Sequence, residues 1–61
     1  MNHADMQRRL RKLDNASLRY VMNDCREAMA ANPDNPKCGD YQDTILYCDM
    51  ELAKRARKAA K

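Results

Sequence analysis

Hydrophobic residues recur at intervals of three and four along most of the chain, which is the spacing of one face of an α-helix. The most continuous stripe comprises Leu18, Val21, Met22, Cys25, Ala28 and Met29. A later stripe comprises Tyr41, Ile45, Cys48 and Leu52, and a shorter early one comprises Met6, Leu10 and Leu13. The pattern predicts an all-α fold with three helices.

Capping and helix-breaking residues set the expected ends of these helices. Asp14 and Asn15 are good N-cap residues, because their side-chain oxygens accept hydrogen bonds from free backbone N–H groups. Pro33 ends the helix before it, and Asn35-Pro36 resembles an N-cap followed by proline at the first helical position. We expect helices over residues 4–13, 15–31 and 36–58, with a turn at 32–35.

A turn this short predicts that the second and third helices are antiparallel neighbours, forming a helical hairpin within one domain, residues 1–61. At 1.5 Å per residue the helices would be roughly 25 Å and roughly 34 Å long, so the third overhangs the open end. We expect the short first helix to pack near that overhang. Gly39 falls in the first turn of the third helix, and we interpret it as marking the close approach of a neighbouring backbone.

The size of the chain favours self-association. A domain of 61 residues buries only about 60% of the surface that its unfolded chain exposes, and this one contains no Phe or Trp. The third helix also carries a second apolar flank that the second helix alone cannot cover, made of Leu46, Tyr47, Met50 and Ala53. This flank predicts a homo-oligomeric bundle or the docking of the first helix.

Charge is unevenly distributed. Residues 1–13 carry a net charge of +3, residues 14–53 carry −5 and residues 54–61 carry +5. A hairpin would bring both basic segments to its open end, where phosphates could be contacted by Arg8, Arg9, Arg11, Lys12, Lys54, Arg55, Arg57 and Lys58. A nucleic-acid-binding module is therefore one hypothesis. Basic residues at a helix C-terminus also interact favourably with the helix dipole, and no aromatic residue lies among these cations.

No pattern of catalytic or metal-binding residues is present, so we expect neither an enzyme nor a cofactor. The only histidine, His3, lies near the N-terminus. A zinc site formed by Cys25, Cys38 and Cys48 is disfavoured, since no two of them lie within four residues. Helix geometry also places Cys25 and Cys48 at different distances from the turn, so we interpret both as core residues. Unpaired cysteines, the lack of a signal peptide and the shortness of every apolar run predict a cytoplasmic protein that does not cross a membrane.

The turn offers a different kind of candidate site. Asn35, Lys37, Gly39 and Tyr41 gather at the start of the third helix, where free N–H groups favour anions. Asp34 and Asp40 oppose such binding, and every one of these residues also has a structural reason to be in a turn. The candidate residues for a ligand crevice between chains are Arg19, Tyr20, Lys37, Gly39 and Tyr41.

The segment SLRYVMNDCREAMAANP, joined to NPKCGDYQDTILYCDMEL, resembles a widespread group of small accessory proteins of tailed bacteriophages. The likeness covers about residues 17–55. It implies expression in a bacterial host and a role in host takeover, counter-defence or phage DNA metabolism, and it transfers no catalytic residue. The predicted architecture is also similar to helical-hairpin phage proteins that sequester cyclic nucleotide signals as oligomers, although their motifs are not matched here.

Two functions are therefore expected from the sequence. The first is a non-enzymatic, homo-oligomeric phage accessory protein that sequesters an anionic nucleotide signal or blocks a host protein. The second is the nucleic-acid-binding module that uses the basic segments. A structural component of the virion is also compatible with the sequence.

Overall fold

The computed structural model describes residues 3–59, and this part of the chain is helical with no strand. Helix α1 spans His3–Arg11, α2 spans Asn15–Ala31 and α3 spans Cys38–Ala59. The all-α class and the three helices are thereby confirmed for residues 3–59. The predicted domain limits include residues 1–2 and 60–61, which lie outside the described residues.

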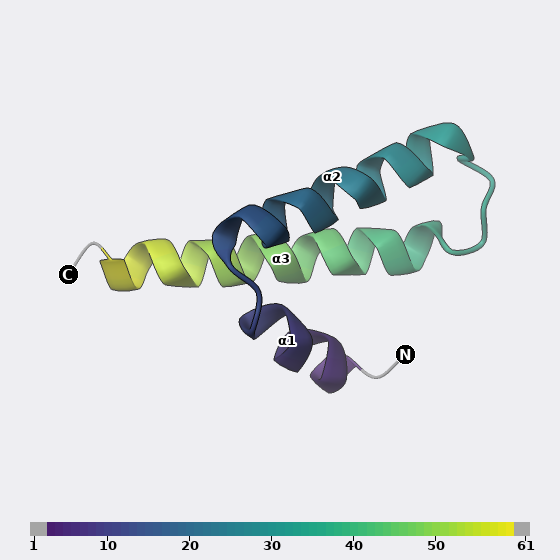
Figure 1. Cartoon of the computed structure of the whole chain (residues 1–61). Coiled ribbons are helices and arrows are strands. Elements are labelled where there is room, and N and C mark those ends of the chain that lie inside the picture. The colour runs from purple at the N-terminus through teal and green to yellow at the C-terminus, as the bar shows by residue number, and fades with distance from the viewer. Residues whose placement is uncertain (1–2, 60–61) are drawn as a thin grey trace.

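Helix α3 is the element against which the other two helices pack. Helices α2 and α3 lie side by side, joined at one end by residues 32–37, while α1 lies beside the middle of α3, on the other side from α2 in this view (Figure 1). The molecule is elongated, with extents of 42 × 22 × 14 Å. Helix α3 thus has one side against α2, another beside α1, and a remaining exposed side.

Helix α2 has the predicted boundaries, and its capping contacts explain them. The Ser17 N–H donates to Oδ1 of Asp14 at 2.7 Å, which satisfies one free donor at the N-terminus. At the other end the N–H of Asn32 donates to the carbonyl of Ala28 at 3.2 Å. Helix α1 ends at Arg11, two residues before the predicted limit, where a turn closes with the Leu13 N–H on the carbonyl of Leu10.

The predicted start of the third helix at residue 36 is wrong, because α3 begins at Cys38. Asn35 closes a turn instead of capping the helix directly. Its Oδ1 accepts the N–H of Lys37 at 2.9 Å, and its carbonyl accepts the N–H of Cys38 at 3.0 Å. The Tyr41 N–H then donates to the carbonyl of Lys37 at 3.0 Å, which is the first bond of α-helical spacing. Pro36 therefore lies in a turn.

The interpretation of Gly39 as a point of close backbone approach is also wrong. A Cβ atom built at Gly39 would meet no neighbouring atom within 4 Å. Its φ angle is not positive either, so its backbone conformation is open to other residues. Neither packing nor conformation within the described chain requires a glycine here.

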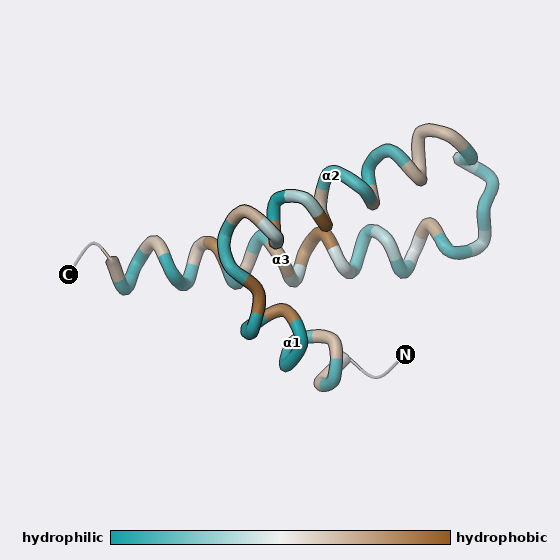
Figure 2. Tube along the Cα trace, in the orientation of Figure 1, coloured by the Kyte–Doolittle hydropathy of each residue, from teal (hydrophilic) through white to brown (hydrophobic). Residues whose placement is uncertain are grey.

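The core lies where the three helices meet. Leu18 of α2 and Cys48 of α3 are fully buried, and Met6 and Leu10 of α1 join them together with Met22. Half-buried apolar side chains surround this cluster: Leu13, Val21, Ile45, Tyr47 and Leu52. The most hydrophobic parts of the trace gather at this junction (Figure 2). Docking of α1 thus supplies part of a core that α2 and α3 alone would leave open.

Cys25 of α2 and Cys48 of α3 are both buried. Burial raises the pKa of the Cys48 thiol, and the neighbouring Cys25 adds to that effect. Burial is also the main reason why the pKa of Cys25 is raised, with Asp24 contributing. Both thiols are buried and free of disulfides, as expected for core residues.

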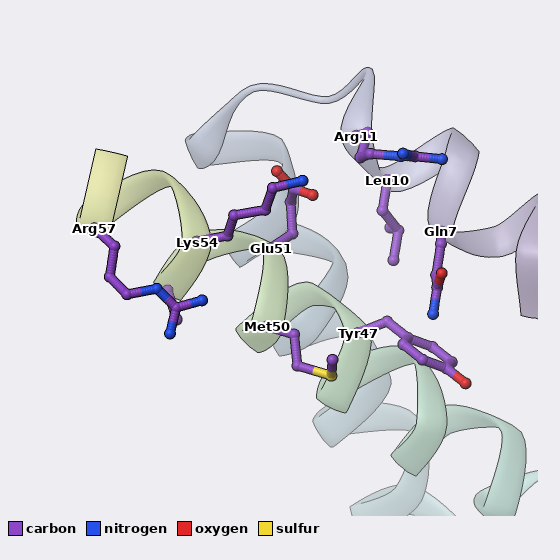
Figure 3. A pocket seen from close by; sticks show the side chains of 9 residues that line it. Gln7, Leu10, Arg11, Tyr47, Met50, Glu51, Lys54 and Arg57 are labelled. Carbon is purple, nitrogen blue, oxygen red and sulfur yellow. The ribbon is translucent and has the colours of Figure 1, made fainter. Parts of the chain in front are cut away.

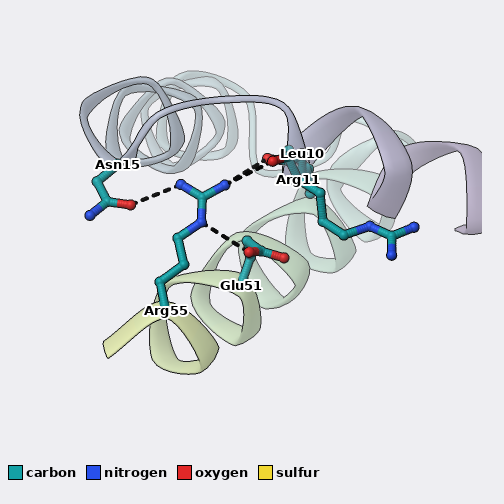
Figure 4. Close-up of polar contacts among 5 residues, drawn as sticks. All are labelled: Leu10, Arg11, Asn15, Glu51 and Arg55. Carbon is teal, nitrogen blue, oxygen red and sulfur yellow. Dashed lines mark hydrogen bonds and ion pairs between the residues drawn. The ribbon is translucent and has the colours of Figure 1, made fainter. Parts of the chain in front are cut away.

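Arg55 of α3 connects all three helices through its guanidinium group (Figure 4). Its Nε donates to Glu51 one turn earlier at 2.9 Å, and Nη1 donates to Oδ1 of Asn15, the first residue of α2, at 2.8 Å. Its Nη2 donates to the last carbonyls of α1, those of Leu10 at 3.5 Å and Arg11 at 3.1 Å. A positive charge at a helix C-terminus also opposes the negative end of the dipole. Arg55 therefore holds α1 against the α2–α3 pair.

Replacing Arg55 with alanine should lower the free energy of unfolding by about 2 kcal/mol, because the part-buried Leu10 carbonyl and Glu51 carboxylate lose a charged donor. Arg55→Lys should recover only part of this loss, since an ammonium group cannot span the same acceptors. Urea denaturation followed by circular dichroism measures the free energy of unfolding of both variants. Lys58→Ala, which removes an exposed cation from the same helix, serves as the control, and an equal loss in that variant would contradict the role of Arg55.

The N-cap of α2 should make stability depend on pH in acid. Hydrogen bonds from the Ser17 side chain and backbone, aided by the charge of Arg55, hold the pKa of Asp14 below its ordinary value of 3.8. A carboxyl whose pKa is lower in the folded state stabilises the fold above its unfolded pKa, and this contribution is lost as the pH falls through the folded pKa.

The wild-type protein should therefore be more stable than Asp14→Asn at neutral pH. The difference between their unfolding free energies should shrink once the pH falls below 3.8. Denaturant titrations of both proteins at about pH 7 and about pH 2 measure that difference. A constant difference at both values would exclude the charge of Asp14 as its source.

Candidate anion-binding groove

A groove of about 420 Å³ runs between α1 and the neighbouring face of α3 (Figure 3). The side chains that line it come from two turns of α1 and three turns of α3: Gln7, Leu10, Arg11, Tyr47, Met50, Glu51, Ala53, Lys54 and Arg57. Within each helix they recur at spacings of three and four residues, so they share one helical face. The groove exists because α1 is docked beside this face.

The groove combines an apolar floor with a basic rim. Leu10 is buried beneath it, and Tyr47, Met50 and Ala53 provide aromatic and aliphatic surface. The rim carries the exposed cations Arg11, Lys54 and Arg57. Such a combination suits a ligand that has both a flat apolar part and a negative charge.

Glu51 is the one acidic side chain that lines the groove, and its charge is balanced. Its Oε2 lies 2.9 Å from Nε of Arg55, and both side chains are largely shielded from solvent. Three cations on the rim therefore remain without an opposing charge among the lining residues. The resulting positive potential favours an anion.

A second, smaller hollow of about 270 Å³ lies near the turn. It is lined by Met6, Lys37, Asp40, Tyr41 and Thr44. The charges of Lys37 and Asp40 offset each other there, and the Thr44 hydroxyl already donates to the carbonyl of Asp40 at 2.9 Å. This hollow has no excess positive charge and is a weaker anion site than the groove.

The five candidate ligand residues are brought together only in part. Lys37 and Tyr41 share the second hollow, and the exposed Gly39 lies between them in sequence. Arg19 and Tyr20 lie on the first turns of α2, at the end where Asn15 meets Arg55, and Tyr20 is 73% exposed. The turn joins the last residue of α2 to the first residue of α3, so the start of α2 lies far from the start of α3 (Figure 1). The two groups of residues therefore do not form one site within a single chain.

The eight candidate phosphate-contacting residues do not form one surface either. Arg11, Lys54 and Arg57 line the groove, whereas the donors of Arg55 are engaged within the fold. Arg8 lies 3.8 Å from Asp5 on the exposed side of α1. The others are exposed and do not line the groove: Arg9, Lys12 and Lys58.

Only part of the first basic segment reaches the basic end of α3. The Thr44 hydroxyl lies 3.6 Å from Sδ of Met6, so the beginning of α1 lies beside the acidic half of α3. Arg11 at the end of α1 lines the same groove as Lys54 and Arg57 (Figure 3). The tertiary structure thus selects three cations from a larger basic set.

Sequence reasoning did not select Gln7, Tyr47 and Met50 as site residues. Tyr47 and Met50 were identified as an uncovered apolar flank, and Lys54 follows them at helical spacing. This combination of an apolar flank and a cation on one face was a usable signal. The contribution of Gln7 could not be found in the same way, because it depends on where α1 docks.

Other kinds of site are not seen in residues 3–59. No group of three or more His, Cys, Asp or Glu side chains in this range could hold a metal ion. None of the described helices combines the length and the apolar character needed to span a membrane. Comparisons of the chain with protein-family models, curated proteins and solved structures found no match.

The three thiols should differ in reactivity. Burial raises the pKa of Cys25 and of Cys48, which keeps them in the unreactive thiol form. Cys38 is half-buried at the start of α3, with Sγ 3.6 Å from the carbonyls of Asn32 and Pro33. Iodoacetamide should modify Cys38 at least about 10-fold faster than the other two, as followed by peptide mass spectrometry. Similar rates at all three positions in the native protein would contradict the described core.

Proposed function

We propose that this chain is a non-enzymatic accessory binding protein of phage type that captures an anionic nucleotide in the cytoplasm of a bacterial host. Its role would be host takeover or counter-defence, by removal of a nucleotide signal. The observation that carries the proposal is the groove between α1 and α3, with three cations on its rim and Tyr47 and Met50 on its floor.

A nucleotide fits both parts of this surface. Its phosphates match the cations of the rim, to which they would bind by charge-assisted hydrogen bonds. The flat, apolar faces of its base can pack on the groove floor made of Tyr47, Met50 and Ala53. The volume of about 420 Å³ lies within the usual range of small-molecule sites.

The groove supports a nucleotide in preference to the blocking of a host protein. A protein interface normally needs a broad surface, of about 800 Å² on each partner. The groove is instead a concave feature between two helices, lined by nine residues. Its chemistry does overlap with that of a single-stranded nucleic acid, since both ligands present phosphates and bases.

We also propose that the fold is a helical hairpin that works as a homo-oligomer. Leu46 and Met50 are each 54% exposed, and Tyr20 is exposed further. These are large apolar side chains for the surface of a chain of 61 residues. Burying them against a second copy would add to the small core that one chain can form.

Nucleotide binding should depend on the rim cations. Isothermal titration with AMP, cyclic di-AMP and inorganic phosphate should show the nucleotides binding more tightly than phosphate, because only they reach the floor. Lys54→Ala and Arg11→Ala should each weaken nucleotide binding by about 10-fold, equivalent to ~1.4 kcal/mol. Lys58→Ala removes a cation outside the groove and should leave the affinity unchanged.

The same titrations decide between the two ligand classes. A single-stranded oligonucleotide that binds much more tightly than any mononucleotide, with a steep dependence on salt, would favour the nucleic-acid alternative. Equal losses in Lys54→Ala and Lys58→Ala would show general electrostatic attraction and overturn the groove as the site. No binding of any of these ligands by the wild-type protein would overturn the proposed function.

A further inference from the structure

The side of α3 away from α2 carries a regular seam of five residues, three of which also border the groove. It consists of Asp43, Leu46, Met50, Ala53 and Arg57, at spacings of three, four, three and four. This is the heptad spacing of helices that pack along their length. Leu46 and Met50 at its centre are each 54% exposed, and Ala53 and Arg57 are exposed as well.

The position of this seam follows from the helical period. Cys48 is fully buried between the helices, and Leu46 and Met50 lie about 160–200° around α3 from it. Leu46 and Asp43 line neither the groove nor the second hollow. Leu46 therefore faces away from α2 and lies outside the groove, while Met50 lies at the border between the groove and this exposed side of α3.

The charges at the two ends of the seam are opposite and symmetrically placed. Asp43 lies seven residues before Met50, and Arg57 lies seven residues after it. Arg57 is exposed, while Asp43 is half-buried. A two-fold axis near Met50 would therefore bring Asp43 of each copy to the level of Arg57 of the other copy.

We propose that two copies of this chain associate through this seam, with their α3 helices antiparallel and Met50 near the two-fold axis. Leu46 of one copy packs beside Ala53 of the other, and each Asp43 faces an Arg57. A parallel pair would instead place Asp43 against Asp43 and Arg57 against Arg57. The charge pattern thus specifies both the partner, a second copy, and its direction.

This arrangement rests on the proposed homo-oligomer but not on the proposed ligand. Met50, Ala53 and Arg57 belong to the seam and also line the groove, so the two grooves of the dimer lie near its axis and Arg57 is shared between the groove rim and the pair with Asp43. A crevice between chains then combines groove residues of both copies. Only Leu46 and Met50 contribute large apolar side chains to the seam. The dimer should therefore be weak, forming at high protein concentration and dissociating on dilution.

Sedimentation velocity of the wild-type chain from about 10 μM to about 500 μM should show the mass rising from 7.1 kDa toward twice that value. Leu46→Glu should abolish this rise, because it buries a carboxylate in the seam. Ala30→Glu adds the same charge at an exposed position of α2 and should dimerise like the wild type. A dimer that survives Leu46→Glu would overturn the seam and leave an oligomer formed by another face.

Charge exchange tests the antiparallel direction. Asp43→Arg alone and Arg57→Asp alone should each weaken the homodimer by at least about 10-fold, since each places like charges together. A mixture of these two variants should form a heterodimer, and the chain with both substitutions should recover the homodimer. Formation of the heterodimer also shows that the two single variants remain folded, which circular dichroism checks directly.

The outcomes separate this inference from the proposed function. Homodimers unaffected by either single exchange, or no heterodimer in the mixture, would overturn the antiparallel seam. A wild-type chain that stays monomeric over the whole range would overturn the seam and the proposed oligomer together. Nucleotide titration of Leu46→Glu, which leaves all groove residues in place, measures ligand binding independently of these results.

Discussion

The contact between the Arg55 guanidinium and the end of α1 is the interaction on which the remaining structure depends. Helix α1 has only nine residues, too few to be stable in water without tertiary support. Its last carbonyls receive hydrogen bonds from Arg55, while Met6 and Leu10 become part of the core. Asn15 shares the same guanidinium, so the position of α1 is linked to the start of α2.

The docking of α1 creates both the core and the groove. The side of α1 that holds Leu10 closes the cluster around Leu18 and Cys48, and Arg11 beside it forms part of the basic rim. The ion pair with Arg55 also balances Glu51, the one acid among the lining residues. A single arginine therefore supports the fold and leaves the groove with an excess of positive charge.

Helix α3 serves three surfaces because the chain is short. Ile45, Cys48 and Leu52 pack toward α2, Tyr47 and Lys54 border the groove beside α1, and Leu46 and Met50 form the exposed centre of the seam. In a larger domain separate elements would supply these surfaces. Here one helix supplies all three, the groove and the seam share Met50, Ala53 and Arg57, and a one-residue change in register along α3 would affect every surface.

The sequence by itself determined the helices, the limits of α2 and most of the core, because these follow from local periodicity and capping. It also indicated the apolar flank at Tyr47 and Met50. The tertiary structure alone decided where α1 docks, which cations share the groove and why Arg55 belongs to the fold, since these depend on contacts between residues more than 40 positions apart. The start of α3 was predicted two residues too early, because the Asn35 side chain closes a turn by accepting the Lys37 N–H. The same residues could also have capped a helix, and the sequence does not distinguish these two local hydrogen-bond patterns.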